Sequence, residues 1–417
     1  MSSCVLQSQP KTKEEAPMNT QPVPTYNLQY SLFTHFFGNP DDLSNTIEFW
    51  DAIPKFALSP RAQDKMRSPD GILQVYTQKF QHHPSPKGEN SARIYQLTMR
   101  PARVETGEGW KEYYPSADEE LVEEVLRKIH CDQTLGLGIH DPEKTESWVR
   151  FSLSMIRAEL KTRGKSRSIS EIKQSLEILA NTKIEVKSTG VKHAKKLHYS
   201  PLSDLMSVER ADYLDDPKSL WCARLPALYS LSINNLTYRQ YNYGLNMRLK
   251  SPLSRWLYKR LCHEFLNADL TTPYRIKFTT IERDSGMLNH SRKAKNLASV
   301  SKVLAELQQA GALLLVDEKR ILQGRKIADV VYSLTAHPGF IKDMIAANKR
   351  KSEAEKAYFA AGISGEARTR HIAKETRKGR LAKPLIKARA EEKARQKAKD
   401  KADQWADKVD AAARPFD

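Results

Sequence analysis

The sequence predicts a protein of the α+β class that contains two tandem units with the same order of elements. Segments that alternate apolar and polar residues, as strands do, stand beside segments with the spacing of amphipathic helices. The order strand, helix, second helix and hairpin occurs twice, over residues 148–186 and again over 274–316. The apolar positions of the two copies match at an offset of 127 between Phe151 and Phe278, and of 128 in the second helix. This repeat favours two related domains.

Composition places limits on the class of protein. With 417 residues, 40% hydrophobic and 28% charged, the chain is long enough for two or three domains with real cores. We expect no membrane span, because no run of about 18 apolar residues occurs. The start of the chain lacks the apolar stretch of a signal peptide, and the four cysteines form no Cys-x-x-Cys motif, which favours the cytoplasm. The net charge of +18 predicts salt-dependent binding to a polyanion.

Composition and pattern divide the chain into five regions. We expect a disordered arm over residues 1–26, an N-terminal segment over 27–90, the first unit over 91–246, the second over 247–345 and a basic Ala/Lys-rich tail over 346–417. The tail has few large apolar residues, so it is expected to be a solvated helix or disordered.

The first unit is expected to begin with strands and a long helix. Residues 94–99 alternate as a strand does. A helix starts near Ser116, with Asp118, Glu119 and Glu120 in its first turn and a following apolar stripe. The repeated pattern then gives a strand at residues 148–151, a helix that starts at Ser168 or Ser170, and a hairpin that includes residues 184–186.

The second unit carries clearer boundary signals. Ser251 and Pro252 are a capping residue and a proline at the first helical position. A strand over 274–278, a helix over 279–285 and a longer helix over 291–310 follow, and Gly311 suits a left-handed C-terminal cap.

The repeated order is the plan of a winged helix, a unit that reads DNA by placing its second helix in the major groove. Polar and basic side chains gather where such a helix would meet DNA. In the second copy, the amino end of the helix and the hairpin give the candidates Asn289, His290, Ser291, Arg292, Lys293, Lys295, Asn296, Lys319, Arg320, Arg325 and Lys326. In the first copy, the candidates precede the helix, lie on it or lie on the expected wing: Arg163, Lys165, Arg167, Lys173, Gln174, Lys192, Lys195 and Lys196. We expect the helices to contact bases and the wings to contact phosphates.

The sequence contains no convincing catalytic, cofactor or metal motif. Gly164-Lys165-Ser166 resembles the end of a phosphate-binding loop, but Glu159 stands where that motif needs glycine. His82 and His83 are adjacent, so they do not form the His-x-His pair typical of nicking enzymes. We therefore expect a binding protein without catalysis, cofactor or metal.

In its order of elements and apolar spacing, the chain resembles plasmid replication initiators of the TrfA/Rep type, which have two winged-helix domains. The resemblance covers about residues 90–340, and its matching stretches are 151–186 and 249–315. It implies binding to origin repeats (iterons) in double-stranded DNA, opening of the origin, recruitment of the replicative helicase and host initiator, and a change between monomer and dimer.

The same resemblance gives a meaning to a short N-terminal peptide. Gln29, Tyr30, Ser31, Leu32 and Phe33 are similar to the Gln-Leu-Ser/Asp-Leu-Phe peptide that binds the bacterial sliding clamp, with Tyr30 in place of the usual leucine. Leu32 and Phe33 would enter an apolar pocket and Gln29 would hydrogen-bond at its edge. Packing of this aromatic segment on its own domain is the alternative.

Two other functions fit parts of the pattern. A winged-helix transcriptional regulator or autorepressor would use the same fold on a promoter. A structural protein with an RNA-binding tail would depend on the basic residues after position 349.

Overall fold

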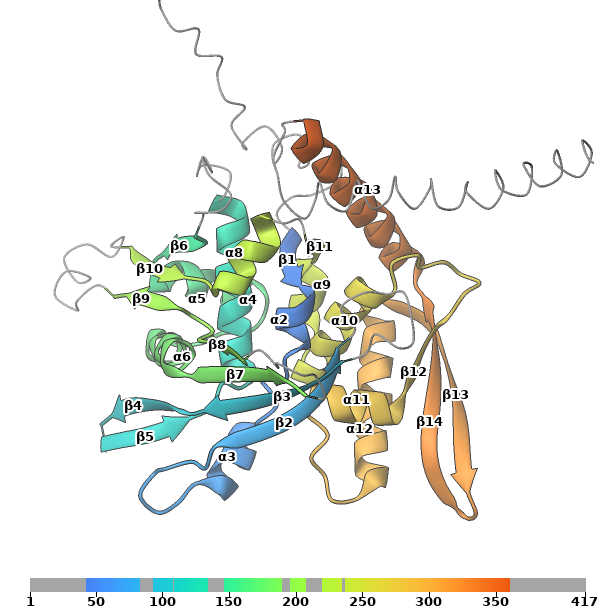
Figure 1. Cartoon of the computed structure of the whole chain (residues 1–417), viewed down its shortest axis with the longest axis horizontal. Helices are drawn as coiled ribbons and strands as arrows, with labels where there is room; N and C mark the ends of the chain where they lie inside the picture. The colour runs from blue at the N-terminus through green and yellow to red at the C-terminus, as the bar shows by residue number, and fades with distance from the viewer. Residues whose placement is uncertain are drawn as a thin grey trace, which may run out of the picture.

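The structure is a computed structural model that describes residues 43–82, 93–107, 109–133, 146–189, 196–207, 220–234 and 237–360. It is a mixture of helices and antiparallel sheets (Figure 1), which confirms the α+β class. Within these residues no helix is both long and apolar enough to cross a membrane.

The second unit has the order and pairing of a winged helix. Its elements are α10 (Pro252–Glu264), β12 (Tyr274–Lys277), α11 (Phe278–Ser285), α12 (Lys293–Gln309), β13 (Leu313–Gln323) and β14 (Lys326–Ala336). The strands form one antiparallel sheet in the order β12-β14-β13. Ser251 accepts a hydrogen bond from the Ser254 amide, with Pro252 at the first helical position, as predicted. Gly311 has φ +79°, which confirms the left-handed end of α12.

The first unit repeats this plan. Its elements are α4 (Ala117–Gln133), β6 (Trp148–Phe151), α5 (Leu153–Thr162), α6 (Ile169–Asn181), β9 (Asp204–Met206) and β10 (Trp221–Arg224). The sheet order β6-β10-β9 corresponds to β12-β14-β13 of the second unit. Ser168 and Glu171 form the reciprocal hydrogen bonds of a capping box at the start of α6.

The expected wing of the first unit is wrong in its pairing. The hairpin after α6 exists as β7 (Lys183–Ser188) and β8 (Lys196–Tyr199), but it does not pair with β6. It joins β2 (Tyr76–His82) and β3 (Arg93–Arg100) in a sheet of order β2-β3-β7-β8. Leu97 and Met99 of β3 lie opposite Val186 and Ile184, so two buried apolar rows meet there. Strands β9 and β10 take the place of the wing.

The N-terminal segment shares a core with the first unit. It contains β1 (Leu43–Ile47), α2 (Glu48–Ala52) and α3 (Pro60–Met66), and β4 (Ala102–Thr106) and β5 (Gly109–Tyr113) form a hairpin beyond β3. Trp50 and Phe80 are fully buried in the same hydrophobic cluster as Leu126 and Leu176. Burial of these large side chains makes residues 43–82 part of the first unit's core.

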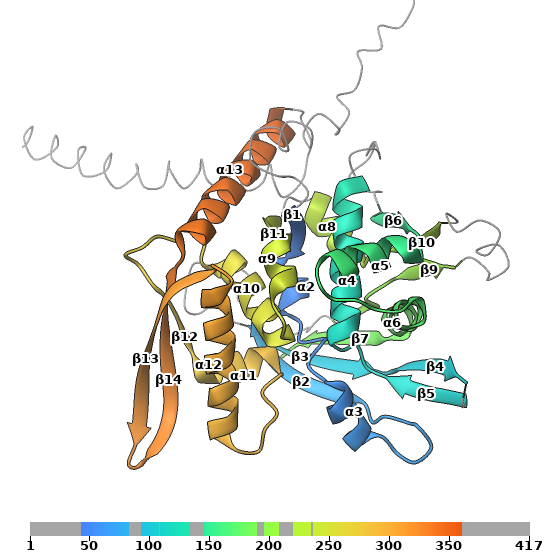
Figure 2. The ribbon, with the colours of Figure 1, turned by 180° about the vertical axis from the view of Figure 1, so that it is seen from behind.

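Three further helices complete the described chain: α8 (Ala227–Asn234), α9 (Tyr243–Arg248) and α13 (Pro338–Ala360). Strand β11 (Tyr238–Asn242) pairs with β1, so the N-terminal segment is tied to the connection between the units. Helix α13 extends away from the second unit and passes β11 (Figure 2). The second hydrophobic cluster includes Phe340 and Met344 of this helix, so α13 begins as part of the second unit.

Candidate nucleic-acid interface

Helix α12 has a polar amino end, and one face of the helix is buried along its length. Val300, Leu304 and Leu307 lie in the core, which confirms the predicted apolar stripe. Most candidate residues at its start are exposed, namely Asn289, His290, Ser291, Arg292 and Lys295. Arg292 is the capping residue of the helix, and its side chain makes no capping hydrogen bond. These side chains have the placement that contact with a groove requires.

Asn296 does not belong to this exposed set, which corrects the prediction, because the residue is only 3% exposed. Its amide oxygen accepts a hydrogen bond from the His290 backbone N–H at 3.0 Å. Its amide nitrogen donates to the Leu288 and His290 carbonyls, each at 3.1 Å, and to Glu282 at 3.2 Å. Asn296 therefore holds the loop between α11 and α12 in place and is not available to a base.

Lys293 is also engaged inside the second unit. Its Nζ donates to the Ala328 carbonyl at 2.6 Å and lies 5.5 Å from the centre of the Phe278 ring. This contact connects the start of α12 to strand β14. The side chain is half-buried, so its first role is to hold the helix against the wing.

The wing of the second unit carries its predicted cations on the surface. Lys319 and Arg320 lie on β13, and Arg325 and Lys326 lie at the turn into β14; all four are exposed. Gly324 has φ +62° in that turn, a conformation that favours glycine. The hairpin projects beyond the rest of the unit (Figure 1), so these cations can approach a phosphate backbone.

The cations that precede α6 in the first unit contact other parts of the protein. Arg163 pairs with Glu159 at 2.9 Å, and its guanidinium lies 5.1 Å from the Tyr243 ring centre. Arg167 pairs with Asp118.

Lys165 links the two units. Its Nζ donates to the Leu249 carbonyl at 3.1 Å, just before α10, and burial lowers the pKa of its ammonium group. The loop before α6, where the sequence placed three DNA-binding candidates, is therefore a region of internal contact.

The remaining candidates of the first unit are dispersed. Lys173 is exposed and Gln174 is half-buried on α6. Lys196 is exposed on β8 and pairs with Glu185 at 3.2 Å. Lys192, Lys195 and the peptide Gln29–Phe33 lie outside the described residues. Within the described chain, the second unit thus has the denser set of exposed polar and basic side chains.

A buried ionic cluster joins the two units, and the sequence reasoning missed it. The cluster consists of four carboxylates and four cations, each at most 5% exposed at its side chain: Asp51, Glu120, Glu123, Glu124, Lys55, Arg127, Arg255 and Lys259. They come from α2, the turn after it, and α4 on one side, and from α10 on the other. The sequence did carry a signal, because α4 combines a run of charged residues at helical spacing with an apolar stripe.

The geometry of the cluster fixes α10 against α4. Arg255 bonds Glu120 at 2.7 Å, and Lys259 bonds Glu124 at 2.7 Å. Arg127 bonds Asp51 at 2.9 Å. Burial alone would raise the pKa of Asp51, but Arg127, Lys259 and the nearby Lys55 hold it well below its usual value. Asp51 is therefore charged and needs these cations.

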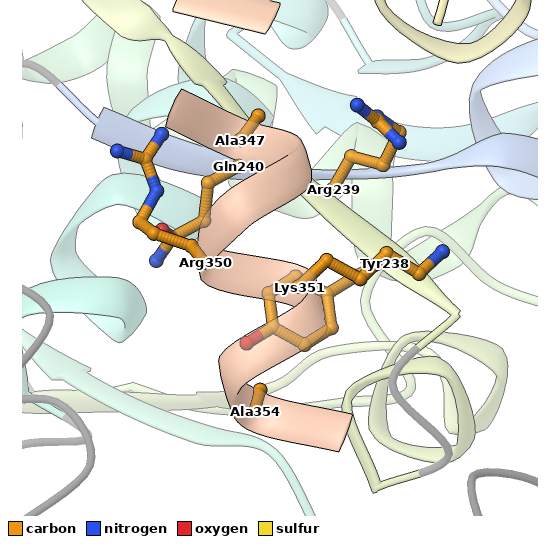
Figure 3. A pocket seen from close by; sticks show the side chains of 7 residues that line it. All are labelled: Tyr238, Arg239, Gln240, Ala347, Arg350, Lys351 and Ala354. Atoms are coloured by element: carbon orange, nitrogen blue, oxygen red, sulfur yellow. The ribbon is translucent and has the colours of Figure 1, made fainter. Parts of the chain in front are cut away.

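A shallow basic pocket lies where α13 crosses β11. Tyr238, Arg239 and Gln240 line it from the strand, and Ala347, Arg350, Lys351 and Ala354 line it from the helix (Figure 3). Arg239 donates to Asn348 of α13 at 2.7 Å, and Asn348 donates to the Leu266 carbonyl at 2.8 Å. These bonds show that the first part of α13 is docked on the protein.

In the described ranges, no group of three or more His, Cys, Asp or Glu side chains is arranged to hold a metal ion. No protein-family model matches the chain, and no curated protein matches it. Among solved structures, the chain is similar to RctB domains 2 and 3, with 12% identity and a TM-score of 0.41 over 71% of this chain and 98% of that chain. It is also similar to the Pi initiator protein in complex with iteron DNA, with 12% identity and a TM-score of 0.36 over 58% of this chain and 98% of that chain. These TM-scores are below 0.5, so the likeness by itself assigns no function to this chain.

Proposed function

We propose that this protein is a plasmid DNA replication initiator that binds origin repeats in double-stranded DNA through both winged helices, acts in the cytoplasm and performs no catalysis. One observation supports it most: two winged-helix units are joined by a buried ionic cluster, and α12 of the second unit has an exposed polar amino end. Two readers held at a fixed orientation suit repeated sites on one face of DNA. The resemblance to TrfA/Rep initiators, carried by residues 151–186 and 249–315, supports the step from DNA binding to initiation.

The contacts within the protein support different DNA-binding roles for the two units. We assign base contacts to Asn289, His290, Arg292 and Lys295, which are exposed at the start of α12. Arg and Asn can each make two hydrogen bonds to a base edge. The four wing cations face phosphates, which explains part of the expected salt dependence. The first unit contributes through Lys173 and Lys196, since Arg163, Lys165 and Arg167 serve internal contacts.

Footprinting on the parent replicon tests this function. We expect protection of direct repeats of about 20 base pairs beside an A·T-rich stretch, whose weakly stacked steps open easily. Protection of a single operator beside a promoter would instead support the alternative, a transcriptional regulator. Equal binding to random DNA at moderate salt would contradict both.

A truncation separates this proposal from a tail-dependent nucleic-acid binder. Removal of residues 361–417 leaves α13 complete, including buried Ala354. Specific binding to the repeats should survive this deletion within a few fold. Loss of all DNA binding would show that the tail, and not the winged helices, carries the function.

Recruitment of host proteins is part of the proposal. The peptide Gln29–Phe33 would bind the sliding clamp, and other surfaces would contact the replicative helicase and host initiator. Clamp binding by the full chain and by a Leu32→Ala/Phe33→Ala variant tests the peptide, with repeat binding as the control for folding. Equal clamp binding by the two proteins would exclude it.

A further inference from the structure

Strand β13 is a long edge strand with an unusual surface. Among the described strands it pairs with β14 alone, and it forms the outer border of the second unit in both views (Figures 1 and 2). Leu314, Leu315, Ile321 and Leu322 are 50%, 51%, 41% and 63% exposed. An exposed edge with apolar side chains is a template for another strand.

The sequence of this edge is self-complementary. Between the two register shifts of the hairpin, β13 is regular over Leu315–Ile321, and Glu318 is the centre of that stretch. Acidic Asp317 lies on one side of the centre and basic Lys319 on the other, with apolar Leu315 and Ile321 outside them. These four residues share the sheet face away from the core, because their partners on β14 alternate with buried Tyr332 and Leu334.

We propose that a second copy of this chain pairs with β13 in antiparallel fashion about a two-fold axis at Glu318. A two-fold axis perpendicular to the sheet keeps each residue on its own face, so only residues an even number of positions apart can lie opposite each other. Centred on Glu318, the pairing sets Asp317 opposite Lys319 of the second copy and Leu315 opposite Ile321, each twice. Opposite charges and paired apolar side chains both stabilise neighbouring strands.

The neighbouring register is worse in its apolar pairs. Centred on Lys319, it would set Glu318 opposite Arg320 of the second copy and two lysines against each other, so its charge pairs balance as in the favoured register; however, Ile321 would lie opposite Asp317 in place of Leu315. In the favoured register, Glu318 lies opposite Glu318 of the second copy. Arg320 of the second copy is its diagonal neighbour and offsets this repulsion. The pairing would join two three-stranded sheets into one.

Pairing would also occupy Lys319, which the proposed function places against phosphate. This consequence rests on that function, whereas the pairing itself does not. The experiment therefore uses the full chain without DNA, so that failure of pairing and failure of DNA binding are distinguishable.

Sedimentation equilibrium at low salt, up to about 100 µM protein, measures the association. The wild-type chain should form dimers. Asp317→Lys places a lysine opposite Lys319 at both symmetry-related positions. This like-charge repulsion should weaken association about tenfold. Adding Lys319→Asp to that variant reverses both charges and should restore wild-type association. Glu105→Lys makes the same charge change at an exposed position on β4 and should have no effect.

Three results would overturn the proposal. A wild-type chain that stays monomeric would show that the charges on β13 protect the edge from pairing. Association unaltered by Asp317→Lys would place the dimer contact elsewhere. Failure of the double reversal to restore association would show that Asp317 and Lys319 do not face each other across the axis.

Discussion

Replacing Lys259 by methionine should destabilise the whole chain strongly, because this ammonium group lies at the centre of the ionic cluster. Its Nζ lies 2.7 Å from Glu124, 3.4 Å from Asp51 and 3.8 Å from Glu120. Burial would lower the pKa of Lys259, but the three carboxylates raise it, so the group is charged. Methionine fills most of the same volume, so the change removes the charge with little loss of packing.

The magnitude follows from the charge balance of the cluster. Four carboxylates and four cations cancel, so Lys259→Met leaves one net negative charge in a buried site. Removing one partner of a buried pair typically costs about 3–5 kcal/mol. Arg127 remains 3.6 Å from Glu124, and Arg255 remains 2.7 Å from Glu120, so we expect the lower end, about 3 kcal/mol.

Urea unfolding followed by circular dichroism measures the change in the free energy of unfolding. Lys302→Met on the exposed side of α12 is the matched control and should change stability by no more than about 0.5 kcal/mol. Adding Glu124→Gln to Lys259→Met removes the unpaired charge and should recover part of the loss. A loss below about 1 kcal/mol for Lys259→Met would refute the view that the cluster holds the two units together.

Three further predictions concern the second unit. Arg292→Ala should weaken specific DNA binding by about 1–3 kcal/mol at one base position. Lys319→Ala should instead weaken binding to all DNA sequences alike and lower the slope of log K against log salt by about one. Equal effects of both variants on specific and random DNA in filter binding would contradict this division. Asn296→Ala should lower the free energy of unfolding by about 1–3 kcal/mol because it leaves buried groups unpaired, and an unchanged urea midpoint would contradict its structural role. Burial lowers the pKa of His263 to about 3, while the ordinary value is 6.5. The contribution of neutral His263 to the free energy of unfolding is therefore fully present above pH 6.5 and is lost as the pH falls towards 3, with a loss of about 2 kcal/mol at pH 5. This pH-dependent loss should be smaller in His263→Gln.

Burial explains why His263 resists protonation, whereas the Thr46 hydroxyl selects which ring nitrogen carries the hydrogen. It donates to Asp51 at 2.6 Å and lies 3.1 Å from Nε2 of His263. Since its hydrogen is directed to Asp51, the hydroxyl accepts from a neutral imidazole whose Nε2 carries the proton. Protonation would place a positive charge on a ring whose surroundings disfavour the charged form.

Local signals in the sequence predicted the helices of both units correctly. The capping box of Ser168 and Glu171, the Ser251-Pro252 start and the left-handed Gly311 each depend on residues within a few positions of one another. The apolar stripe that includes Leu304 likewise depends on helical spacing alone. For the same reason the sequence located the exposed amino end of α12.

The sequence by itself thus determined the repeated order of elements and the position of α12 with its exposed polar amino end. Tertiary structure alone decided that β7 pairs with β3, that Asn296 is buried, and that the charges of α4 meet α10. Each of these depends on which distant segments come together. Strand pairing partners and the burial of a polar group are set by contacts between residues far apart in the chain, and no spacing within one segment encodes them.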